Sequence, residues 1–366
     1  MALKIALLPG DGVGPEVTAE AVRILKNVAE HTGKSFTFTT HAIGGVAIDA
    51  ECVGLPDATR EACLGANAVL LGAVGHPKFD GRLPSERPEA ALLALRQALG
   101  GFANLRPAMC YAPLANRTAF QTDRVRGADL LIVRELLGGL YYGEPRGFDA
   151  SGDTAFNTLV YSRHEIDRVA RVAFDRARER KKRVASIDKA NVLETSRLWR
   201  SVVSEVAKEY PDVAIEHVYV DTCAMRLATS PTSFDVLLCD NLFGDILSDQ
   251  AASVAGSLGL LPSATLGGRV DLYEPVHGSA PDIAGKGWAN PIGAIASAAM
   301  MLRFTAGMER EAAEIDHAIE DALASGARTR DLAGPGERVV STRDMGQAIE
   351  DALIEARESR HSYHAV

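Results

Sequence analysis

Short apolar or β-branched runs alternate along the chain with longer segments in which apolar residues recur every three or four positions. The runs predict strands and the periodic segments predict amphipathic helices. The expected strands span residues 5–8, 36–40, 68–71, 130–133, 184–187, 215–220 and 236–239. The expected helices span residues 15–30, 89–99, 165–180, 192–210, 291–304, 310–324 and 344–355. This alternation predicts an α/β fold.

One segment follows neither pattern. Residues 136–160 are rich in glycine, tyrosine and threonine and lack helical periodicity. We therefore expect a protruding β hairpin or arm there. Periodicity alone does not place a domain boundary.

Composition and charge narrow the class of partner. A chain of 366 residues with 47% hydrophobic content can form about two domains with substantial cores. Lys and Arg total 39 against 48 Asp and Glu, and the net charge of -9 gives no chain-wide basic field for nucleic acid or an anionic membrane. A small molecule is therefore the expected partner.

The sequence also bears on the compartment. The first ten residues show no export signal, and the longest apolar stretch, 293–302, is shorter than the roughly 20 residues of a membrane span. The 5 cysteines are scattered without metal-ligand spacing, which is typical of reduced thiols packed as small core residues. We expect a cytoplasmic protein.

A glycine-rich turn follows the first strand. Gly10, Gly12 and Gly14 superficially imitate the turn that carries a dinucleotide pyrophosphate. That fingerprint requires two residues before its last glycine, whereas Val13 alone stands there, and Glu16 would place a negative charge where phosphate should lie. We expect instead a tight turn that brings the backbone near a ligand or a neighbouring loop.

Two carboxylates lie where a buried strand leads into a helix. Asp245 and Asp249 are four residues apart, so both project from one helix face. Like charges at this spacing repel, and a hard cation such as Mg²⁺ or Mn²⁺ would relieve the repulsion. Alternatively, the two acids only complement the helix dipole. Asp221, at the end of the expected strand 215–220, is a candidate third ligand or a turn former.

Five further residues could act on a substrate. Arg96, Arg106 and Arg134 would hold a substrate with two or three carboxylates if they converge, although a lone arginine is usually a solvated surface residue. Lys189 follows a strand at a position where active-site residues gather, and is either a base or a surface turn residue. Tyr141 could donate a proton or simply pack in the hairpin.

Six long motifs occur in order along nearly the whole chain. They are GDGVGPEV at 10–17, FANLRP at 102–107, RELLGGLYYGEPRG at 134–147, DKANVLETSRLWR at 188–200, DNLFGDILSDQAA at 240–252 and EPVHGSAPDIAGKGWANP at 274–291. Together they resemble the β-decarboxylating dehydrogenases, the isocitrate/isopropylmalate dehydrogenase family. Within that family the chain is most similar to the members that oxidise 3-isopropylmalate.

The resemblance implies a fold and an assembly. It implies a two-domain α/β fold with a shared continuous sheet, which is not a Rossmann fold. Residues 1–101 and 256–366 would form a cofactor-binding domain, and residues 102–255 would form a second domain for dimerisation, metal and substrate. In the implied homodimer, Lys189 and Asp221 of one subunit complete the other subunit's site, and the arm at 136–160 contacts the partner.

The resemblance also implies a reaction, the NAD-dependent oxidative decarboxylation of (2R,3S)-3-isopropylmalate to 2-oxoisocaproate (4-methyl-2-oxopentanoate) and CO2 in leucine biosynthesis. The three arginines would bind the malate carboxylates. Lys189 would accept the hydroxyl proton, and Tyr141 would protonate the enolate left by decarboxylation. Mg²⁺ or Mn²⁺ would be held by Asp245, Asp249 and the partner's Asp221.

The implied cofactor and specificity residues lie in two segments. The cofactor loop comprises His277, Gly278, Ser279, Ala280, Pro281, Asp282 and Ile283, with Asn290 beside it. Asp282 can accept hydrogen bonds from ribose hydroxyls but would repel a 2′-phosphate, which favours NAD over NADP. Glu89, Leu92 and Leu93, at i, i+3 and i+4, resemble the patch that recognises the isopropyl group.

Two alternatives to 3-isopropylmalate oxidation stay open. Isocitrate and tartrate enzymes typically have Glu-Asn-Thr-Glu-Gly where this chain has Glu135 to Gly139, a departure that favours isopropylmalate. A D-malate or tartrate dehydrogenase of the same family is nevertheless the nearest alternative. A catalytically idle regulatory subunit is another, although the chain retains every proposed catalytic position.

Overall fold

The chain forms two compact units. The computed structural model describes residues 2–364, with side chains up to residue 359. The first unit comprises Met1–Gly100, Tyr111–Arg117 and Ala255–Val366, and the second comprises Gly101–Cys110 and Thr118–Val254. The segment Tyr111–Arg117 was expected in the second domain, but the buried Arg328 donates a hydrogen bond to the Pro113 carbonyl within the first unit.

A parallel sheet with one antiparallel strand forms the centre of the first unit. Its strand order is β2 (Phe36–Thr40), β1 (Leu3–Gly10), β3 (Ala68–Ala73), β12 (Asp271–Pro275) and β11 (Pro262–Leu266). Only β11 runs antiparallel to its neighbour β12 among these pairs of the described chain. Strand β3 is buried at every position, as expected for a parallel strand covered on both faces.

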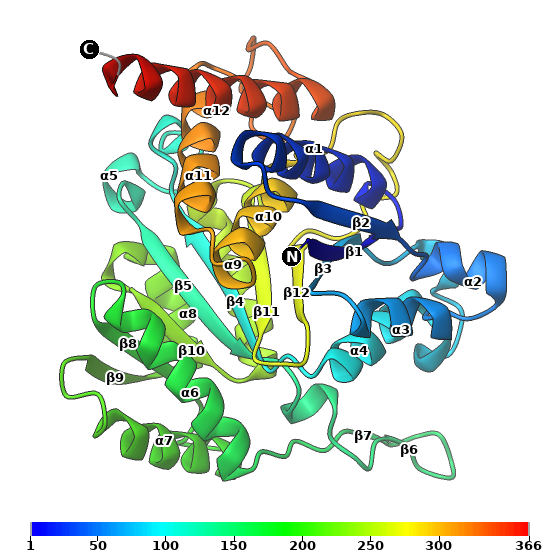
Figure 1. The fold of residues 1–366 in the computed structure, drawn as a ribbon. Coiled ribbons are helices and arrows are strands. Elements are labelled where there is room, and N and C mark those ends of the chain that lie inside the picture. The colour runs from blue at the N-terminus through cyan, green and yellow to red at the C-terminus, as the bar shows by residue number, and fades with distance from the viewer. Residues whose placement is uncertain (1, 365–366) are drawn as a thin grey trace. The chain divides into compact units, whose positions relative to one another are not determined.

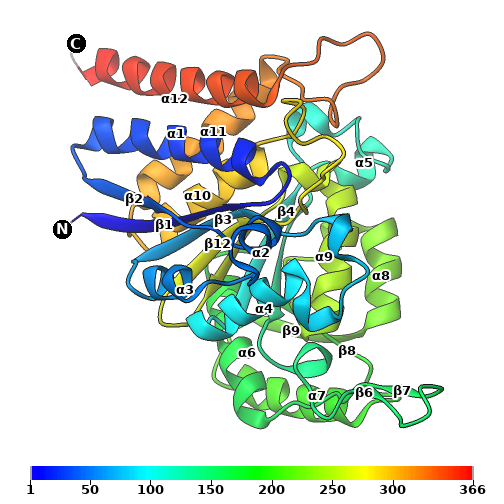
Figure 2. The ribbon, with the colours of Figure 1, turned by 90° about the vertical axis from the view of Figure 1, so that its right-hand side faces the viewer.

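Helices cover both faces of this sheet (Figures 1 and 2). On one face lie α1 (Gly14–Thr32), α10 (Ile292–Phe304), α11 (Glu309–Ala324) and α12 (Thr342–His364). On the other lie α2 (Gly45–Glu51), α3 (Asp57–Leu64) and α4 (Pro88–Leu99). A core cluster that includes Leu8, Leu71, Leu95 and Leu99 joins the sheet to α4.

The second unit contains five strands of the sheet, with helices on both faces of them. The strand order is β4 (Ala103–Met109), β5 (Asp129–Glu135), β10 (Val236–Cys239), β8 (Arg183–Asp188) and β9 (Ala214–Tyr219), with β4 antiparallel to β5. Helices α6 (Arg163–Arg178) and α7 (Glu194–Ala207) pack on one face, and α8 (Val220–Thr229) and α9 (Asn241–Ala255) on the other. The short helix α5 (Thr122–Val125) precedes β5.

Every strand and helix expected from periodicity is present, although α12 extends further than predicted. Within residues 136–160, β6 (Gly147–Phe148) and β7 (Ala155–Phe156) form the expected hairpin. The placement of Asp221 at a strand end is wrong, because β9 ends at Tyr219 and Asp221 lies in the first turn of α8. Cys52 is exposed rather than packed in the core, whereas the other cysteines are buried. Along the described chain, no helix has the length and apolar character of a membrane span.

The glycine-rich turn after β1 is fixed to a neighbouring loop. Gly12 has φ +59°, and a Cβ atom there would lie 1.9 Å from the Ser279 carbonyl oxygen. The Val13 N–H donates to that same oxygen at 2.8 Å. Glu16 accepts hydrogen bonds from two backbone N–H groups of the segment 285–287. The expectation of a tight turn that brings the backbone near a neighbouring loop is confirmed.

The buried Asp11 in this turn anchors the loops around it, which gives a stability prediction. Its carboxylate accepts backbone hydrogen bonds from Gly45, Val46 and Gly75 at 2.8–2.9 Å. Asp11→Ala leaves buried donors unsatisfied and should lower the free energy of unfolding by about 2–4 kcal/mol, measured by urea denaturation. Asp49→Ala, which removes an exposed ion pair with Lys78, should cost less than about 1 kcal/mol. Equal losses in the two variants would contradict the anchoring role.

Candidate active site

The candidate active site of the second unit begins with an arginine at the end of a strand. Cys239 of β10 is paired in register with Arg134 of β5, so the carboxyl ends of these parallel strands meet at one edge, where ligands bind in α/β sheets. Arg134 is 2% exposed, and its Nη1 forms an ion pair with Asp245 Oδ1, one turn into α9. The edge of the sheet and the start of α9 are thereby tied together.

Arg106 reaches the same carboxylates from the neighbouring strand β4. Its Nη1 lies 3.4 Å from Asp245 Oδ1 and 3.9 Å from Asp249 Oδ1. The same nitrogen donates to Ser248 Oγ at 2.7 Å, and Nε donates to Asn104 Oδ1 at 2.7 Å. Because one guanidinium reaches both carboxylates, Asp245 and Asp249 lie on the same face of α9.

Tyr141 completes this cluster from the short turn Gly139–Tyr141. Its hydroxyl donates to Asp245 Oδ2 at 2.6 Å, and the Arg134 guanidinium lies 5.5 Å from the centre of its ring. Burial, and then the hydrogen bond to Asp245, raise the pKa of Tyr141 to about 12. The hydroxyl therefore carries its proton at neutral pH and can act as a proton donor.

The two aspartates suit a divalent cation. Burial raises the pKa of Asp249, with a further contribution from the charge of Asp245, while Arg106 acts in the opposite direction. A cation between the carboxylates would offset this repulsion, and carboxylate oxygens are ligands that Mg²⁺ and Mn²⁺ prefer. Among the described residues, no group of three or more acidic, histidine or cysteine side chains forms a metal cluster.

Lys189 and Asp221 form a second group in this unit. Lys189 follows β8, and its Nζ makes an ion pair with Asp221 Oδ1 in the first turn of α8. The hydrogen bond from Lys189 lowers the pKa of Asp221. The described contacts therefore join Asp221 to Lys189 and do not include it with Asp245 and Asp249.

The expected specificity residues lie on α4 of the first unit. Arg96 is buried there and forms an ion pair with Glu274 at 2.6 Å. Glu89 is exposed, and Leu92 packs partly against the core cluster of the unit. The contacts of the described residues bring Arg106 and Arg134 together on Asp245, while Arg96 belongs to the other unit.

A cavity of about 370 Å³ adjoins the expected cofactor loop in the first unit. From that loop, the lining includes His277, Gly278, Ala280 and Ile283, and Asn290 lines it as well. The His277 Nε2 atom is buried and has no hydrogen-bond partner. Ser279, Pro281 and Asp282 do not line the cavity, and Asp282 is exposed to solvent.

The sequence did not single out several residues around this cavity. The Arg330 guanidinium lies 4.0 Å from the centre of the Trp288 ring, and both residues line the cavity. Asp331 accepts hydrogen bonds from Ser257 and from Asn290. Trp288 falls within one of the quoted motifs and could have been found, whereas no motif includes Arg330 or Asp331.

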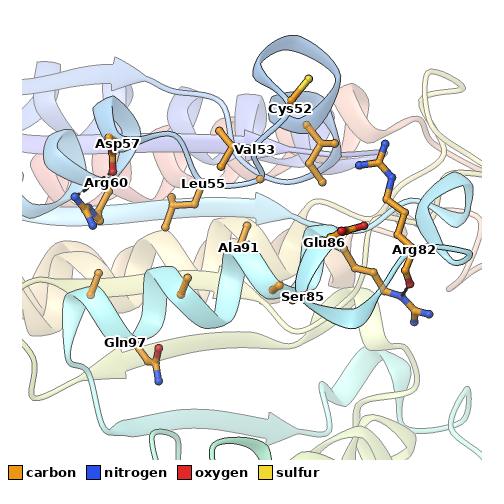
Figure 3. Close-up of a pocket in the computed structure, with 16 residues that line it drawn as sticks. Cys52, Val53, Leu55, Asp57, Arg60, Arg82, Ser85, Glu86, Ala91 and Gln97 are labelled. Carbon is orange, nitrogen blue, oxygen red and sulfur yellow. Dashed lines mark hydrogen bonds and ion pairs between the residues drawn. The ribbon is translucent and has the colours of Figure 1, made fainter. Parts of the chain in front are cut away.

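A larger cavity of about 880 Å³ is lined by residues of α4 and of segments that precede it in the chain (Figure 3). Ala91 of α4 faces Val53 and Leu55 across it, and Arg82 and Glu86 lie at one end. None of the residues expected to act on substrate, metal or cofactor is among its lining residues. Its size alone does not make it the active site.

Asp240, just before α9, is a buried carboxyl group whose ionisation should make the stability depend on pH. It is 8% exposed and accepts a hydrogen bond from the Phe243 N–H at 2.7 Å. Burial, with a contribution from Glu135, raises its pKa to about 7. The folded protein thus binds this proton more tightly than the unfolded chain, where the pKa is about 4. The stabilisation is complete below about pH 4 and is lost as the pH rises through about 7.

Asp240→Asn keeps an oxygen acceptor for Phe243 and removes the ionisation. We expect the variant to have a free energy of unfolding about 1–4 kcal/mol higher than the unsubstituted protein at pH 8, with little difference at pH 4. Urea denaturation at both pH values is the measurement, with the exposed Asp153→Asn as the control. An equal effect at both pH values would show that ionisation of Asp240 is not responsible.

Comparison with known proteins assigns the chain, first, to the oxidoreductases of α/β fold. Residues 4–349 match the family described as isocitrate/isopropylmalate dehydrogenase, and the chain belongs to this family. The resemblance inferred from the six motifs is confirmed.

Curated relatives cover nearly the full length. The chain is 53% identical over 354 residues to the 3-isopropylmalate dehydrogenase of Moorella thermoacetica, covering 96% of this chain and 99% of the relative. It is 54% identical over 345 residues to that of Salinibacter ruber, covering 94% of each.

Solved structures show the same fold. The isocitrate dehydrogenase from Methylococcus capsulatus superimposes with a TM-score of 0.86 at 38% identity, covering 96% of this chain and 99% of that one. The β-decarboxylating dehydrogenase from Thermococcus kodakarensis gives a TM-score of 0.79 at 35% identity and covers 96% of each chain.

Proposed function

We propose that this protein oxidises and decarboxylates (2R,3S)-3-isopropylmalate to 2-oxoisocaproate and CO2 with NAD, in leucine biosynthesis. The convergence of Arg106, Arg134 and the Tyr141 hydroxyl on Asp245 is the observation that supports this most directly. It combines cationic groups for substrate carboxylates, an oxygen ligand for a metal and a proton donor. The names of relatives at 53–54% identity point to the same substrate.

Arg106 and Arg134 are held in place for carboxylate binding. Asn104 and Ser248 accept hydrogen bonds from Arg106, and Asn241 accepts two from Arg134. Guanidinium groups fixed in this way lose little further freedom when they bind a carboxylate. Arg96 is a third proposed carboxylate-binding group.

Tyr141 is the proposed proton donor for the carbon that loses CO2. When bound, NAD would supply the hydride acceptor, and a divalent ion held by Asp245 and Asp249 would supply Lewis-acid polarisation of the new carbonyl group. The charges of Arg134 and Arg106 oppose the rise in the pKa of Tyr141, so they would stabilise the phenolate that remains after proton transfer. Lys189 is the proposed base for the substrate hydroxyl.

A homodimer with shared sites is part of the proposal. Exposed apolar side chains lie close to Lys189 and Asp221 in the sequence, namely Val192, Tyr219 and Met225. Further exposed apolar residues of the second unit are Phe148, Phe156, Val160 and Ile246. Large apolar side chains left exposed in this unit support a subunit interface, across which the partner's Lys189 and the partner's Asp221 would act.

NAD is the proposed cofactor. The cavity beside the cofactor loop has mostly apolar walls, and His277 and Asn290 add polar groups to its lining, which suits a purine ring. The exposed carboxylate of Asp282 would accept hydrogen bonds from ribose hydroxyls and repel the 2′-phosphate of NADP. The residues present therefore fit NAD better than NADP.

Substrate choice within the family rests on α4. Leu92 and Leu93 offer an apolar surface beside Glu89, which suits an alkyl substituent rather than the extra carboxylate of isocitrate. One methylene changes discrimination by only about 1–3 kcal/mol, so other 3-alkylmalates are expected as slower substrates. D-malate or tartrate oxidation is the alternative activity within the family.

The first functional test is NADH formation from 3-isopropylmalate with Mg²⁺ or Mn²⁺. We expect turnover that EDTA abolishes and excess metal restores, and a preference for NAD over NADP. Isocitrate, D-malate and tartrate should react more slowly. Faster turnover of D-malate would reject the proposed substrate, insensitivity to EDTA would reject the metal, and absence of all turnover would favour an idle regulatory subunit.

The second test asks whether sites are shared between subunits. Lys189→Ala and Asp245→Asn should each be nearly inactive as homodimers. When the two variants are unfolded together and refolded, half of the dimers are mixed, and each mixed dimer has one intact site if the sites are shared. We expect recovery of about a quarter of normal activity. No recovery, with mixed dimers verified by two affinity tags, would place each site within one chain.

A further inference from the structure

Asn241, the first residue of α9, connects Arg134 with the segment that leads to Tyr141. The proposed reaction uses these two residues at different steps. It is 1% exposed and lies one turn before Asp245. Its side-chain oxygen accepts hydrogen bonds from Arg134 Nε at 3.0 Å and from Nη2 at 2.8 Å. Its side-chain nitrogen donates to the carbonyl oxygens of Leu136 at 3.2 Å and Gly138 at 2.9 Å.

The backbone N–H of Asn241 also helps to fix residues 135–138, through the side chain of Tyr161. Its N–H donates to Tyr161 Oη at 2.9 Å, and that hydroxyl donates to Glu135 Oε2 at 3.3 Å. The Glu135 carboxylate in turn accepts hydrogen bonds from the N–H groups of Leu137 at 3.0 Å and Gly138 at 2.8 Å. Residues 135–138 are thus fixed between Asn241 and Tyr161.

This segment leads directly to the proposed proton donor. Gly139 has φ +72°, and a Cβ atom there would lie 2.5 Å from Tyr161 Oη, so the backbone packs closely on that side chain. The turn that begins at Gly139 ends at Tyr141. The place of the Tyr141 hydroxyl relative to Arg134 therefore depends on the bonds made by Asn241.

We propose that Asn241 is a positioning residue that sets the spacing between the carboxylate-binding Arg134 and the proton-donating Tyr141. The inference rests on the proposed function. An amide is suited to this place because it accepts hydrogen bonds from a guanidinium while it donates two to carbonyl oxygens. A carboxylate can do only the first, and an alanine can do neither.

Asn241→Asp separates the role of the side chain as an acceptor from its role as a donor. The variant keeps the acceptor for Arg134 and loses both donors, so the carbonyl oxygens of Leu136 and Gly138 face a carboxylate and the segment before Tyr141 shifts. A displacement of about 1 Å can slow a positioned reaction by about 100-fold. We therefore expect proton transfer by Tyr141 to slow by about 10–100-fold. Substrate affinity should fall as well, because the new carboxylate lies against Arg134 and competes with the substrate carboxylate.

The reverse of the proposed protonation gives a direct measurement. If Tyr141 delivers a proton to C3 of the product, it also removes one, and the C3 protons of 2-oxoisocaproate exchange with D2O when the protein, Mg²⁺ and NADH are present. Proton NMR follows this exchange without net turnover. Calorimetric titration with 3-isopropylmalate in the presence of Mg²⁺ measures substrate affinity separately.

A double-mutant cycle distinguishes positioning from general damage. Tyr141→Phe removes the donor, so adding Asn241→Asp to it should slow the remaining exchange by less than about 2-fold if Asn241 acts through Tyr141. Tyr161→Phe is the second variant, because it removes one hydroxyl and keeps the ring that packs edge-on against Trp199. Tyr161→Phe should slow exchange by about 3–10-fold and leave the affinity for 3-isopropylmalate unchanged. If Asn241→Asp does not fold, Tyr161→Phe provides the test.

The outcomes separate this inference from the proposed function. Absence of both turnover and exchange in the unsubstituted protein would overturn the proposed function and the inference with it. Normal turnover together with unchanged exchange in Asn241→Asp, or a full additional loss in the double variant, would overturn the inference alone.

Discussion

The ion pair between Arg134 and Asp245 is the interaction on which the candidate site depends. A guanidinium that is 2% exposed cannot be left without partners, because burying an unpaired charge costs several kcal/mol, of order 3–5. Asp245 and Asn241 supply those partners from the first turns of α9. The end of β5, the start of α9 and the segment that carries Tyr141 are consequently fixed together, and a change to one would be felt by the others.

Asp245 is also the residue of the site whose carboxylate several groups contact at once. Arg134, Arg106 and the Tyr141 hydroxyl all reach its two oxygens, and Asp249 adds a like charge on the same helix face. A divalent cation would compete for these oxygens, and substrate carboxylates would compete for the arginines. Binding of the cation and the substrate should therefore favour one another, since each frees groups that the other uses.

The sequence predicts some parts of this molecule much better than others. Regular periodicity was enough for strands such as β1 and β10, and the four-residue spacing was enough to place Asp245 and Asp249 on one face. Strand β4 was missed because Pro107 interrupts its pattern, and α8 because it begins immediately after β9 without a capping residue. The hydrogen bonds of Asn241 and the place of Arg330 over Trp288 depend on contacts between different segments, which no local pattern reveals.

The Lys189–Asp221 pair explains why a single chain would be a poor catalyst under the proposed function. Within one chain, the carboxylate that should help to bind the metal is hydrogen-bonded to the amine that should accept a proton. A cation would attract this carboxylate more strongly than a single ammonium does, so it would weaken the bond that holds the Lys189 amine. Placing that cation on Asp245 and Asp249 of another subunit means that the base would be released only where a complete site has formed. Assembly of the dimer, and not merely folding of the chain, would then determine when Lys189 becomes available.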